Sequence, residues 1–251
     1  MRSFNKIFIL ALPRCATVSL CDALGLLGIP TAHLGCIYGE AAAETNAEHH
    51  HPQRLSRIYQ QISLGDYNLD VLRDCRGLAD YPACCPSVFQ QLDRQYPGSL
   101  FVNVRRDGDL LSWLQSVERQ FIGLQLVKQN VEASADERQF MQVMLSLRAM
   151  TFGQSQFDPE VYLRAYHAYQ QQVEQTFAAR PGDLLQFDDT AELGSVGFER
   201  LCEFLECPNP GWTFPNSNVH SQRPKAAFLQ ALAEGKIKSQ TGIEMGSVIQ
   251  T

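Results

Sequence analysis

Arg14, Thr17 and Ser19 are the residues whose types and spacing most directly suggest chemistry. They follow an apolar run at residues 7–12, and residues 17–27 repeat apolar side chains at helical spacing. A loop between a strand and a helix start is a natural anion site, because backbone N–H groups and the positive end of the helix dipole face it. Arg14 adds a fixed positive charge, and the two hydroxyls add hydrogen-bond donors. The segment is therefore predicted to hold a phosphate or sulfate group.

The same loop lacks the residues of the common nucleotide-binding loop. That loop has the pattern Gly-x-x-x-x-Gly-Lys-Ser/Thr, in which glycines allow close backbone approach and the hydroxyl holds magnesium. Residues 13–19 contain neither glycine nor lysine. The sequence therefore disfavours an ATPase or a kinase.

A second group of charged residues follows another apolar run. Arg105, Arg106 and Asp107 come directly after the apolar residues 100–104. Ligands of open α/β sheets bind at the carboxyl ends of the strands, and paired arginines suit a second phosphate through bidentate hydrogen bonds. Ser116, in the segment Trp113-Leu-Gln-Ser116-Val, is expected to follow on the next helix.

The elements that must position these residues alternate along the chain. A parallel α/β sheet covered on both faces is the architecture that such alternation favours. We expect three layers, with a mainly parallel sheet of about five strands and helices on each side. One domain is expected over residues 1–251, with a mostly helical insertion at about 120–180. Strands are expected at residues 7–12, 29–32, 67–73, 99–104 and 183–187, and helices at 17–27, 54–62, 86–96, 109–117, 132–150, 159–179 and 197–205.

Several of these motifs resemble those of sulfotransferases that use 3′-phosphoadenosine 5′-phosphosulfate. The phosphosulfate loop of that family is commonly Pro-Lys/Arg-x-Gly-Thr-x-Ser/Thr-Leu. This chain matches it at Pro13, Arg14, Thr17, Ser19 and Leu20 and departs from it at Cys15 and Ala16.

The second and third motifs also resemble that family. Arg106-Asp107 matches the strand-end Arg-Asp-Pro, with Gly108 in place of proline, and the distance from Arg106 to Ser116 is about two residues longer than usual, which leaves Ser112 as a rival. Asp80-Tyr81-Pro82-Ala83 resembles the Asp-aromatic-Pro-Ala segment of a subgroup that carries arginine in the phosphosulfate loop. Phe214-Pro-Asn-Ser-Asn218 resembles that subgroup's last loop. Together the resemblance covers residues 6–34, 66–118 and 183–218.

The resemblance implies a P-loop-like sulfotransferase fold and transfer of a sulfuryl group to a hydroxyl or amine of a small-molecule acceptor. The donor 3′-phosphoadenosine 5′-phosphosulfate would be a co-substrate, and no metal is needed. The 5′-phosphosulfate would be held by Pro13, Arg14, Cys15, Ala16, Thr17, Val18 and Ser19. Arg106 and Ser116 would hold the 3′-phosphate, with Arg105 a second candidate.

The same resemblance suggests catalytic roles for Arg14 and Asp80. Arg14 would stabilise the bridging oxygen and the leaving phosphate, in an electrostatic role only, because arginine does not readily give up a proton. Asp80 occupies the place where relatives keep a catalytic acid or histidine and would take the acceptor's proton. A turn or helix cap is the other reading of Asp80, and His33 is a rival base.

The composition restricts the remaining classes of function. The net charge is −6 and no basic stripe is present, so nucleic-acid binding is not expected. None of the eight cysteines forms a Cys-x-x-Cys pair, which argues against structural zinc. No apolar stretch reaches the length of a membrane span. We therefore expect a soluble, cytoplasmic protein with free thiols.

Two alternatives remain. One is a phosphotransferase or nucleotide hydrolase on the same fold, with Asp107 or Asp188 as the acidic metal ligand. The other is a non-catalytic relative that binds a nucleotide or a partner protein. The acceptor is not readable, but its pocket is expected within residues 35–55 and 120–165, with Tyr38, Phe121, Phe152 and Phe157 as candidate linings. The oligomeric state is also not readable.

Overall fold

The computed structural model describes residues 1–39, 50–129, 135–217 and 222–243. Its centre is a six-stranded sheet with the strand order β3-β2-β4-β1-β5-β6. Neighbouring strands are parallel except for the antiparallel pair β2–β3. This confirms the expected α/β fold with a mainly parallel sheet. The strands are β1 (Ile7–Ile9), β2 (Thr31–His33), β3 (Cys36–Tyr38), β4 (Gly77–Ala79), β5 (Leu100–Val104) and β6 (Leu184–Phe187).

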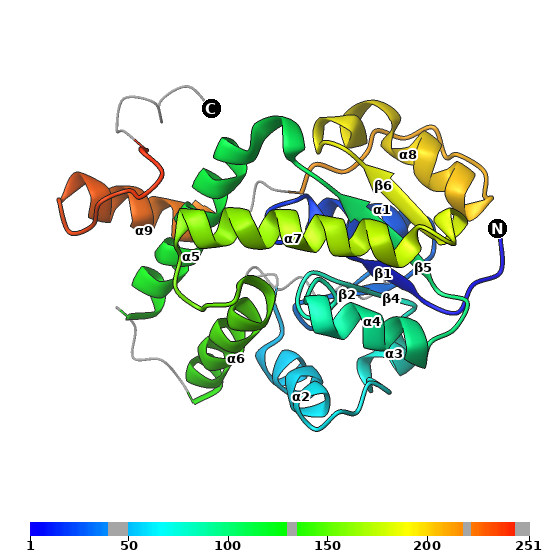
Figure 1. Cartoon of the computed structure of the whole chain (residues 1–251), viewed down its shortest axis with the longest axis horizontal. Helices are drawn as coiled ribbons and strands as arrows, with labels where there is room; N and C mark the ends of the chain where they lie inside the picture. Colours follow the sequence, from blue (N-terminus) through cyan, green and yellow to red (C-terminus); the bar gives the residue numbers. More distant parts are fainter. Residues whose placement is uncertain (40–49, 130–134, 218–221, 244–251) are drawn as a thin grey trace.

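Helices surround the sheet, as Figure 1 shows. Helix α7 crosses in front of the sheet beside α4, and α1 lies behind it (Figure 1). The helices are α1 (Thr17–Leu26), α2 (Pro52–Ser63), α3 (Val71–Asp74), α4 (Pro86–Gln95), α5 (Leu110–Gln129), α6 (Ala135–Phe152), α7 (Pro159–Phe177), α8 (Ala191–Leu205) and α9 (Gln222–Ala233), with short 3₁₀ turns η1 (Asp107–Asp109) and η2 (Pro181–Asp183).

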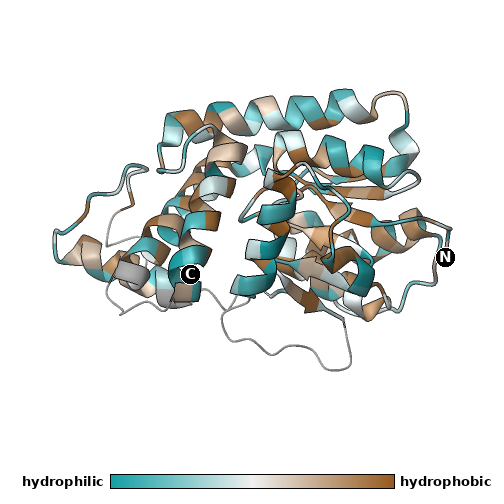
Figure 2. Ribbon diagram, turned by 90° about the horizontal axis from the view of Figure 1, so that it is seen from below, coloured by the Kyte–Doolittle hydropathy of each residue, from teal (hydrophilic) through white to brown (hydrophobic). Residues whose placement is uncertain are grey.

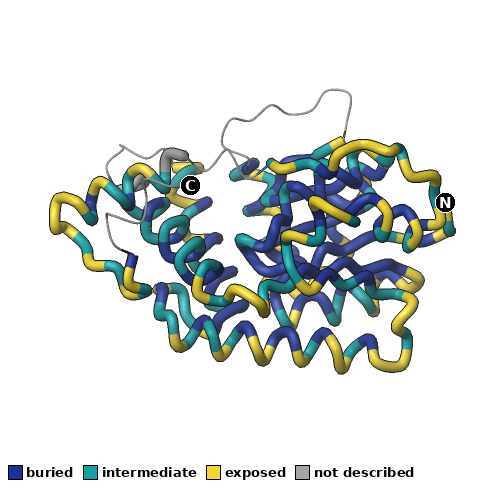
Figure 3. The backbone as a smooth tube through the Cα atoms, turned by 90° about the horizontal axis from the view of Figure 1, so that it is seen from above, coloured by how far each residue is buried: buried dark blue, intermediate teal, exposed yellow. Residues whose placement is uncertain are grey.

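The two helical layers explain why the central strands are apolar throughout. Every residue of β1 and β5 is buried, and the buried part of the chain runs through the middle of the molecule in Figure 3. Phe101 of β5 packs against Phe177 of α7, with ring centroids 4.6 Å apart. Strands covered on both faces need apolar side chains on both, which is the pattern that the sequence has there.

The strand register brings the candidate chemistry to one edge of the sheet. Ala79, the last residue of β4, lies opposite Ile9 of β1 on one side and His33 of β2 on the other. The residues that follow these strands therefore leave the sheet at the same carboxyl edge. Arg105 leaves β5 at that edge too, because β5 also runs parallel to β1.

Helices α5 and α9 extend beyond the sheet and form a second part of the molecule (Figure 1 and Figure 2), whereas α6 packs against α2. Helix α9 packs against α5 so closely that a Cβ atom added at Gly123 would lie 2.1 Å from the carbonyl oxygen of Pro224. Glu118 of α5 is buried and accepts hydrogen bonds from Ser239 Oγ and the backbone N of Gln240. The single domain with a helical insertion at 120–180 stays a prediction.

The structure corrects one expected strand. Residues 67–73 were expected to form a strand, but Leu72 and Arg73 instead donate backbone hydrogen bonds to the carbonyl oxygens of Leu69 and Asp70 and belong to helix α3. The fourth strand lies further on, at Gly77–Ala79. A side chain at Gly77 would come within 2.6 Å of Thr31 Oγ1 on the neighbouring strand, so close strand pairing requires glycine there.

Other differences concern lengths and additional elements. The hairpin strand β3 and helix α9 had no expected counterpart, and α8 starts at Ala191 instead of residue 197. The early start of α8 is fixed by Glu192, whose side chain accepts hydrogen bonds from the backbone N of Asp188 and Asp189. No helix in the described residues is long and apolar enough to cross a membrane.

Candidate functional site

The loop at residues 10–16 is held in a fixed shape by three hydrogen bonds. Trp113 Nε1 donates to the carbonyl oxygen of Pro13 at 3.0 Å, and the Tyr169 hydroxyl donates to that of Leu10 at 2.8 Å. Within the loop, the backbone N of Cys15 donates to Leu12 O at 3.1 Å. Helices α5 and α7 therefore clamp the loop from outside, and its backbone groups keep one orientation.

Ala16 leaves the first turn of α1 open to a ligand. It precedes the helix in the left-handed region, with φ of 57°, and no side chain caps the helix start. The first N–H groups of a helix have no partner within the helix. Thr17, Val18 and Ser19 thus present an N-terminus suited to an anion, as the sequence predicted.

Arg14 lies beside this helix start and reaches α5. Its Nε donates a 3.0 Å hydrogen bond to Ser116 Oγ. Burial lowers the pKa of Arg14, and the carboxylate of Asp80 opposes this effect, while Arg119 and Arg106 add to it. Two further cations therefore act on Arg14 at the loop, an arrangement that a nearby anion would stabilise.

The two arginines after β5 have different surroundings. Arg106 acts electrostatically on both Arg14 and the buried thiol of Cys15. Its Nε is buried without a hydrogen-bond partner in the described residues, and its NH2 lies 3.6 Å from Asp109 Oδ2. Arg105 instead pairs with the carboxylates of Glu174 and Asp107. The structure therefore brings Arg106, and not Arg105, to the loop.

Of the two candidate serines, Ser116 is the one that contacts the loop. Its hydroxyl accepts the hydrogen bond from Arg14. Ser112 lies at the start of the same helix, where its backbone N donates to Asp109 Oδ1 at 3.2 Å. Asp109 thus caps α5.

Thr17, His33 and Asp80 form a buried polar cluster behind the loop. The Thr17 hydroxyl donates to Asp80 Oδ2 at 3.1 Å, and His33 Nε2 lies 3.1 Å from Thr17 Oγ1 and 3.3 Å from Asp80 Oδ2. Because the Thr17 proton points to Asp80, both neighbours of Nε2 are acceptors, so Nε2 carries the proton. His33 Nδ1 is buried and has no hydrogen-bond partner in the part of the chain described.

The loop at residues 208–217 closes over α1 from the other side. The backbone N of Ser217 donates to Ser19 Oγ at 3.1 Å, and the Ser217 hydroxyl donates to Asp22. Ser217, which belongs to the expected motif at residues 214–218, therefore contacts helix α1 directly after the anion-binding loop. Its last residue, Asn218, lies outside the described residues.

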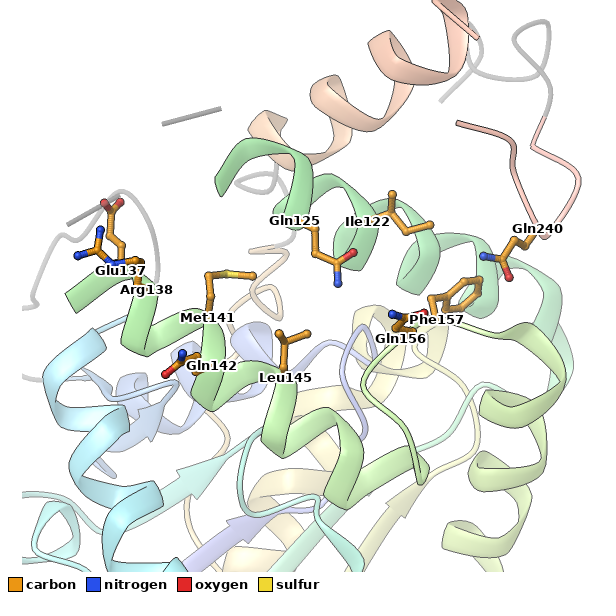
Figure 4. A pocket seen from close by; sticks show the side chains of 10 residues that line it. All are labelled: Ile122, Gln125, Glu137, Arg138, Met141, Gln142, Leu145, Gln156, Phe157 and Gln240. Carbon is orange, nitrogen blue, oxygen red and sulfur yellow. The ribbon is translucent and has the colours of Figure 1, made fainter. Parts of the chain in front are cut away.

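A cleft of about 630 Å³ separates α5 from α6. In Figure 4, Ile122 and Gln125 of α5 face Met141 and Leu145 of α6 across this space. Of the candidate acceptor residues, Phe157 lines this cleft, whereas Phe121 and Phe152 are buried against Tyr162. Residues 40–49 and 130–134 of the expected acceptor region lie outside the described residues.

Arg119 is the cation that the sequence analysis missed. It follows Ser116 by three residues on α5, so both lie on one helix face. Burial lowers the pKa of Arg119, and the charge of Glu118 acts in the opposite direction. The positive charge of Arg119 in turn lowers the pKa of Arg14. The helical spacing from Ser116 was a signal in the sequence that could have found Arg119.

All eight cysteines lie among the described residues, and each is unbridged. No group of three or more histidine, cysteine or carboxylate side chains in the described residues is arranged to hold a metal ion.

A family model described as a sulfotransferase domain matches residues 6–223. The chain therefore belongs to the sulfotransferase family, a family of transferases, and the resemblance found in the motifs is confirmed at that level. The assignment to a subgroup stays a prediction.

Two solved structures are similar to this chain at low identity. The sulfotransferase from Alicyclobacillus acidocaldarius has 15% identity and a TM-score of 0.46, with 93% of each chain covered. The sulfotransferase domain from the curacin biosynthetic pathway has 14% identity and a TM-score of 0.41, with 88% of this chain and 83% of that chain covered. A comparison with curated protein sequences gives no match.

Proposed function

We propose that this protein transfers a sulfuryl group from 3′-phosphoadenosine 5′-phosphosulfate to a hydroxyl or amine of a small-molecule acceptor. The observation that carries the proposal is the uncapped start of α1 beside Arg14, on which the charges of Arg106 and Arg119 act. A donor with phosphate groups at both ends of its ribose needs cationic groups at two places. The loop after β1 and the strand end after β5 supply them at one sheet edge.

The donor's phosphates divide between these two places. The backbone of residues 13–19 and the side chain of Arg14 hold the 5′-phosphosulfate. Arg106, whose Nε has no partner among the described residues, and Ser116 hold the 3′-phosphate. Arg119 is added to the residues that hold the 3′-phosphate, because it lies on the same face of α5 as Ser116. Arg105 is the weaker candidate, since two carboxylates already neutralise it.

Arg14 stabilises the charge that develops during transfer. The bond between sulfur and the bridging oxygen breaks, that oxygen stays with the leaving phosphate, and sulfur forms a bond to the acceptor oxygen or nitrogen. As in phosphoryl transfer, positioning and electrostatics supply most of the rate. Fixed guanidinium groups provide this charge without a metal ion.

The base consists of the Asp80–His33 pair. Both oxygens of Asp80 accept hydrogen bonds, one from Thr17 and one from the backbone N of Tyr81 at 2.7 Å. The His33 ring donates from Nε2, which leaves the lone pair of Nδ1 to take the acceptor's proton. Asp80 then orients the ring and stabilises the imidazolium that forms, as a carboxylate does in a Ser-His-Asp triad.

The alternatives have weaker support. A nucleotide hydrolase or phosphotransferase needs a lysine in the loop, and residues 13–19 contain none. Of its two possible acidic metal ligands, Asp107 is engaged by Arg105 and by the hydroxyl of Tyr166, which donates at 2.8 Å. A non-catalytic relative has no need of the buried Asp80–His33 pair.

Calorimetric titration of adenosine 3′,5′-bisphosphate, the product of the donor, tests the proposal. The titrations use wild-type protein, Arg106→Ala and Arg164→Ala in buffer without magnesium. Arg164 is an exposed arginine on α7 that pairs with Glu160, so its variant controls for net charge. We expect Arg106→Ala to weaken binding by about 1.5–3 kcal/mol, the range for a charge-assisted hydrogen bond, and Arg164→Ala to leave it unchanged. Absence of binding to folded wild-type protein would overturn the proposal.

A further inference from the structure

Arg148 on α6 is a buried cation that the donor site does not use. Only 1% of its surface is exposed. Its Nε, NH1 and NH2 atoms are all buried and have no hydrogen-bond partner among the residues that the structure describes. Burial lowers the pKa of Arg148. A guanidinium in such surroundings carries a large desolvation cost unless an anion meets it.

Two tyrosine hydroxyls that also lack a hydrogen-bond partner among the described residues are close enough to Arg148 to act on its charge. Tyr81 and Tyr162 both act on the guanidinium, and the hydroxyl of each is buried without a hydrogen-bond partner in the described part of the chain. The guanidinium lies over the ring of Phe121, with its Cζ atom 3.7 Å from the centroid. Phe152 stacks on Tyr162 at 4.1 Å, so aromatic rings form the walls of the group.

The chemistry of this cluster selects its ligand. Arginine offers only donors, and each tyrosine hydroxyl has a proton to donate. The matching ligand is a group with acceptors alone, and a carboxylate fits the planar guanidinium with two parallel hydrogen bonds. Buried polar groups are nearly always paired in folded proteins, so three unpaired ones together point to a ligand.

The cluster is linked through its neighbours to the cleft and to the proposed base. Leu145, which lines the cleft, precedes Arg148 by three residues on α6, and Phe157 of the cleft packs against Tyr162 with centroids 5.2 Å apart. Tyr81 directly follows Asp80. These links place the cluster next to the wall of the cleft and next to Asp80, although Arg148, Tyr81 and Tyr162 do not line the cleft themselves.

We propose that Arg148, together with the hydroxyls of Tyr81 and Tyr162, binds the carboxylate of an acidic acceptor. This inference rests on the proposed sulfuryl transfer and names the acceptor class as a hydroxy or amino acid-type molecule that keeps its carboxylate at Arg148. Arg148 is then the residue that sets specificity for acids over neutral alcohols.

Formate is the probe for the first experiment, because it is the smallest carboxylate and needs no further fit. Melting temperatures are measured against formate concentration for wild-type protein, Arg148→Met and the charge control Arg164→Met. We expect the wild type and Arg164→Met to melt several degrees higher at saturation, and Arg148→Met to show no such rise. Without formate, Arg148→Met should melt no lower than wild type, because methionine removes an unpaired buried charge. Tyr162→Phe, which removes one hydroxyl, should show a weaker formate effect.

An equal formate response in Arg148→Met, or none in wild type, would overturn the inference. The second experiment compares each hydroxy acid that wild-type protein turns over with its primary amide. The acid should be favoured at least tenfold in kcat/KM, and Arg148→Met should abolish the preference; equal use of acid and amide by wild type also contradicts the inference. Arg148→Met should bind adenosine 3′,5′-bisphosphate as wild type does. A failure of bisphosphate binding in wild type would instead count against sulfuryl transfer, whatever the formate result.

Discussion

The hydroxyl of Thr17 donates a 3.1 Å hydrogen bond to Oδ2 of Asp80, and this bond joins the first residue of α1 to the residue that follows β4. The two side chains meet because β1 and β4 are adjacent parallel strands that end at the same edge. The anion-binding helix start and the proposed base are therefore held as one unit. A shift of the loop would move Thr17 and disturb both.

The Asp80–His33 pair makes a prediction about non-additive variants. Asp80→Asn and His33→Gln should each lower kcat by about 10²–10⁴-fold, the range for a general base. The double variant should lose little more than the worse single variant, because the two side chains act together. Titration of adenosine 3′,5′-bisphosphate should give the same affinity in all three. Losses that multiply in the double variant would show that the two residues act separately.

Ala16 makes a prediction about stability. Its φ of 57° is costly for a residue with a Cβ atom, by about 1–2 kcal/mol, and glycine removes that cost at the expense of a more flexible unfolded chain. Ala16→Gly should therefore raise the free energy of unfolding by about 0.5–1 kcal/mol. Ala168→Gly, at an exposed site within α7, should lower it by about 0.5–1 kcal/mol. Urea unfolding measures both, and a loss of stability in Ala16→Gly would contradict the assigned backbone.

Sequence reasoning was successful where motif residues follow strongly apolar strands. Arg14, Thr17 and Ser19 follow β1, and Arg106 follows β5, so their place at the sheet edge was predictable from the strand pattern. The strand predicted at residues 67–73 was wrong, because the alternating apolar residues there are buried by a helical turn instead of a strand. The apolar pattern within residues 67–73 does not separate the two cases, and the strand begins instead at Gly77, which packs closely against Thr31.

Interaction partners that are distant in the sequence could not be predicted from it. Arg105 and Arg106 are neighbours with the same side chain, and only the position of Glu174 on α7 decides that Arg105 is neutralised. The burial of Arg148 was equally hidden, because it depends on the packing of α5, α6 and α7 around it. The Cys15 and Ala16 departures, in contrast, were visible in the sequence, and the left-handed backbone at Ala16 explains why glycine is usual there.

The thiol of Cys15 makes a prediction about alkaline pH. Burial raises its pKa from 9.0 to about 12, with the charge of Arg106 opposing the shift. The folded protein then holds this proton more tightly than the unfolded chain, so the stability it contributes is full below pH 9 and is lost as the pH rises toward 12. Between these values wild type should lose about 1.4 kcal/mol per pH unit more than Cys15→Ala. If the two curves of unfolding free energy against pH run parallel in this range, the Cys15 thiol does not contribute the expected loss of stability and the prediction is wrong.

Single-turnover transfer from donor carrying ³⁵S in its sulfuryl group is the decisive test of the proposed reaction and of the role of Arg14 in it. The donor is mixed with wild-type protein or Arg14→Ala, a mixture of phenols, alcohols, amines and hydroxy acids, and a metal chelator. We expect wild type to move the label to an organic acceptor and Arg14→Ala to do so at least 100-fold more slowly, as for the loss of a group that stabilises the transition state. Equal rates in the two proteins, or no transfer by folded wild type that binds the bisphosphate, would contradict this expectation.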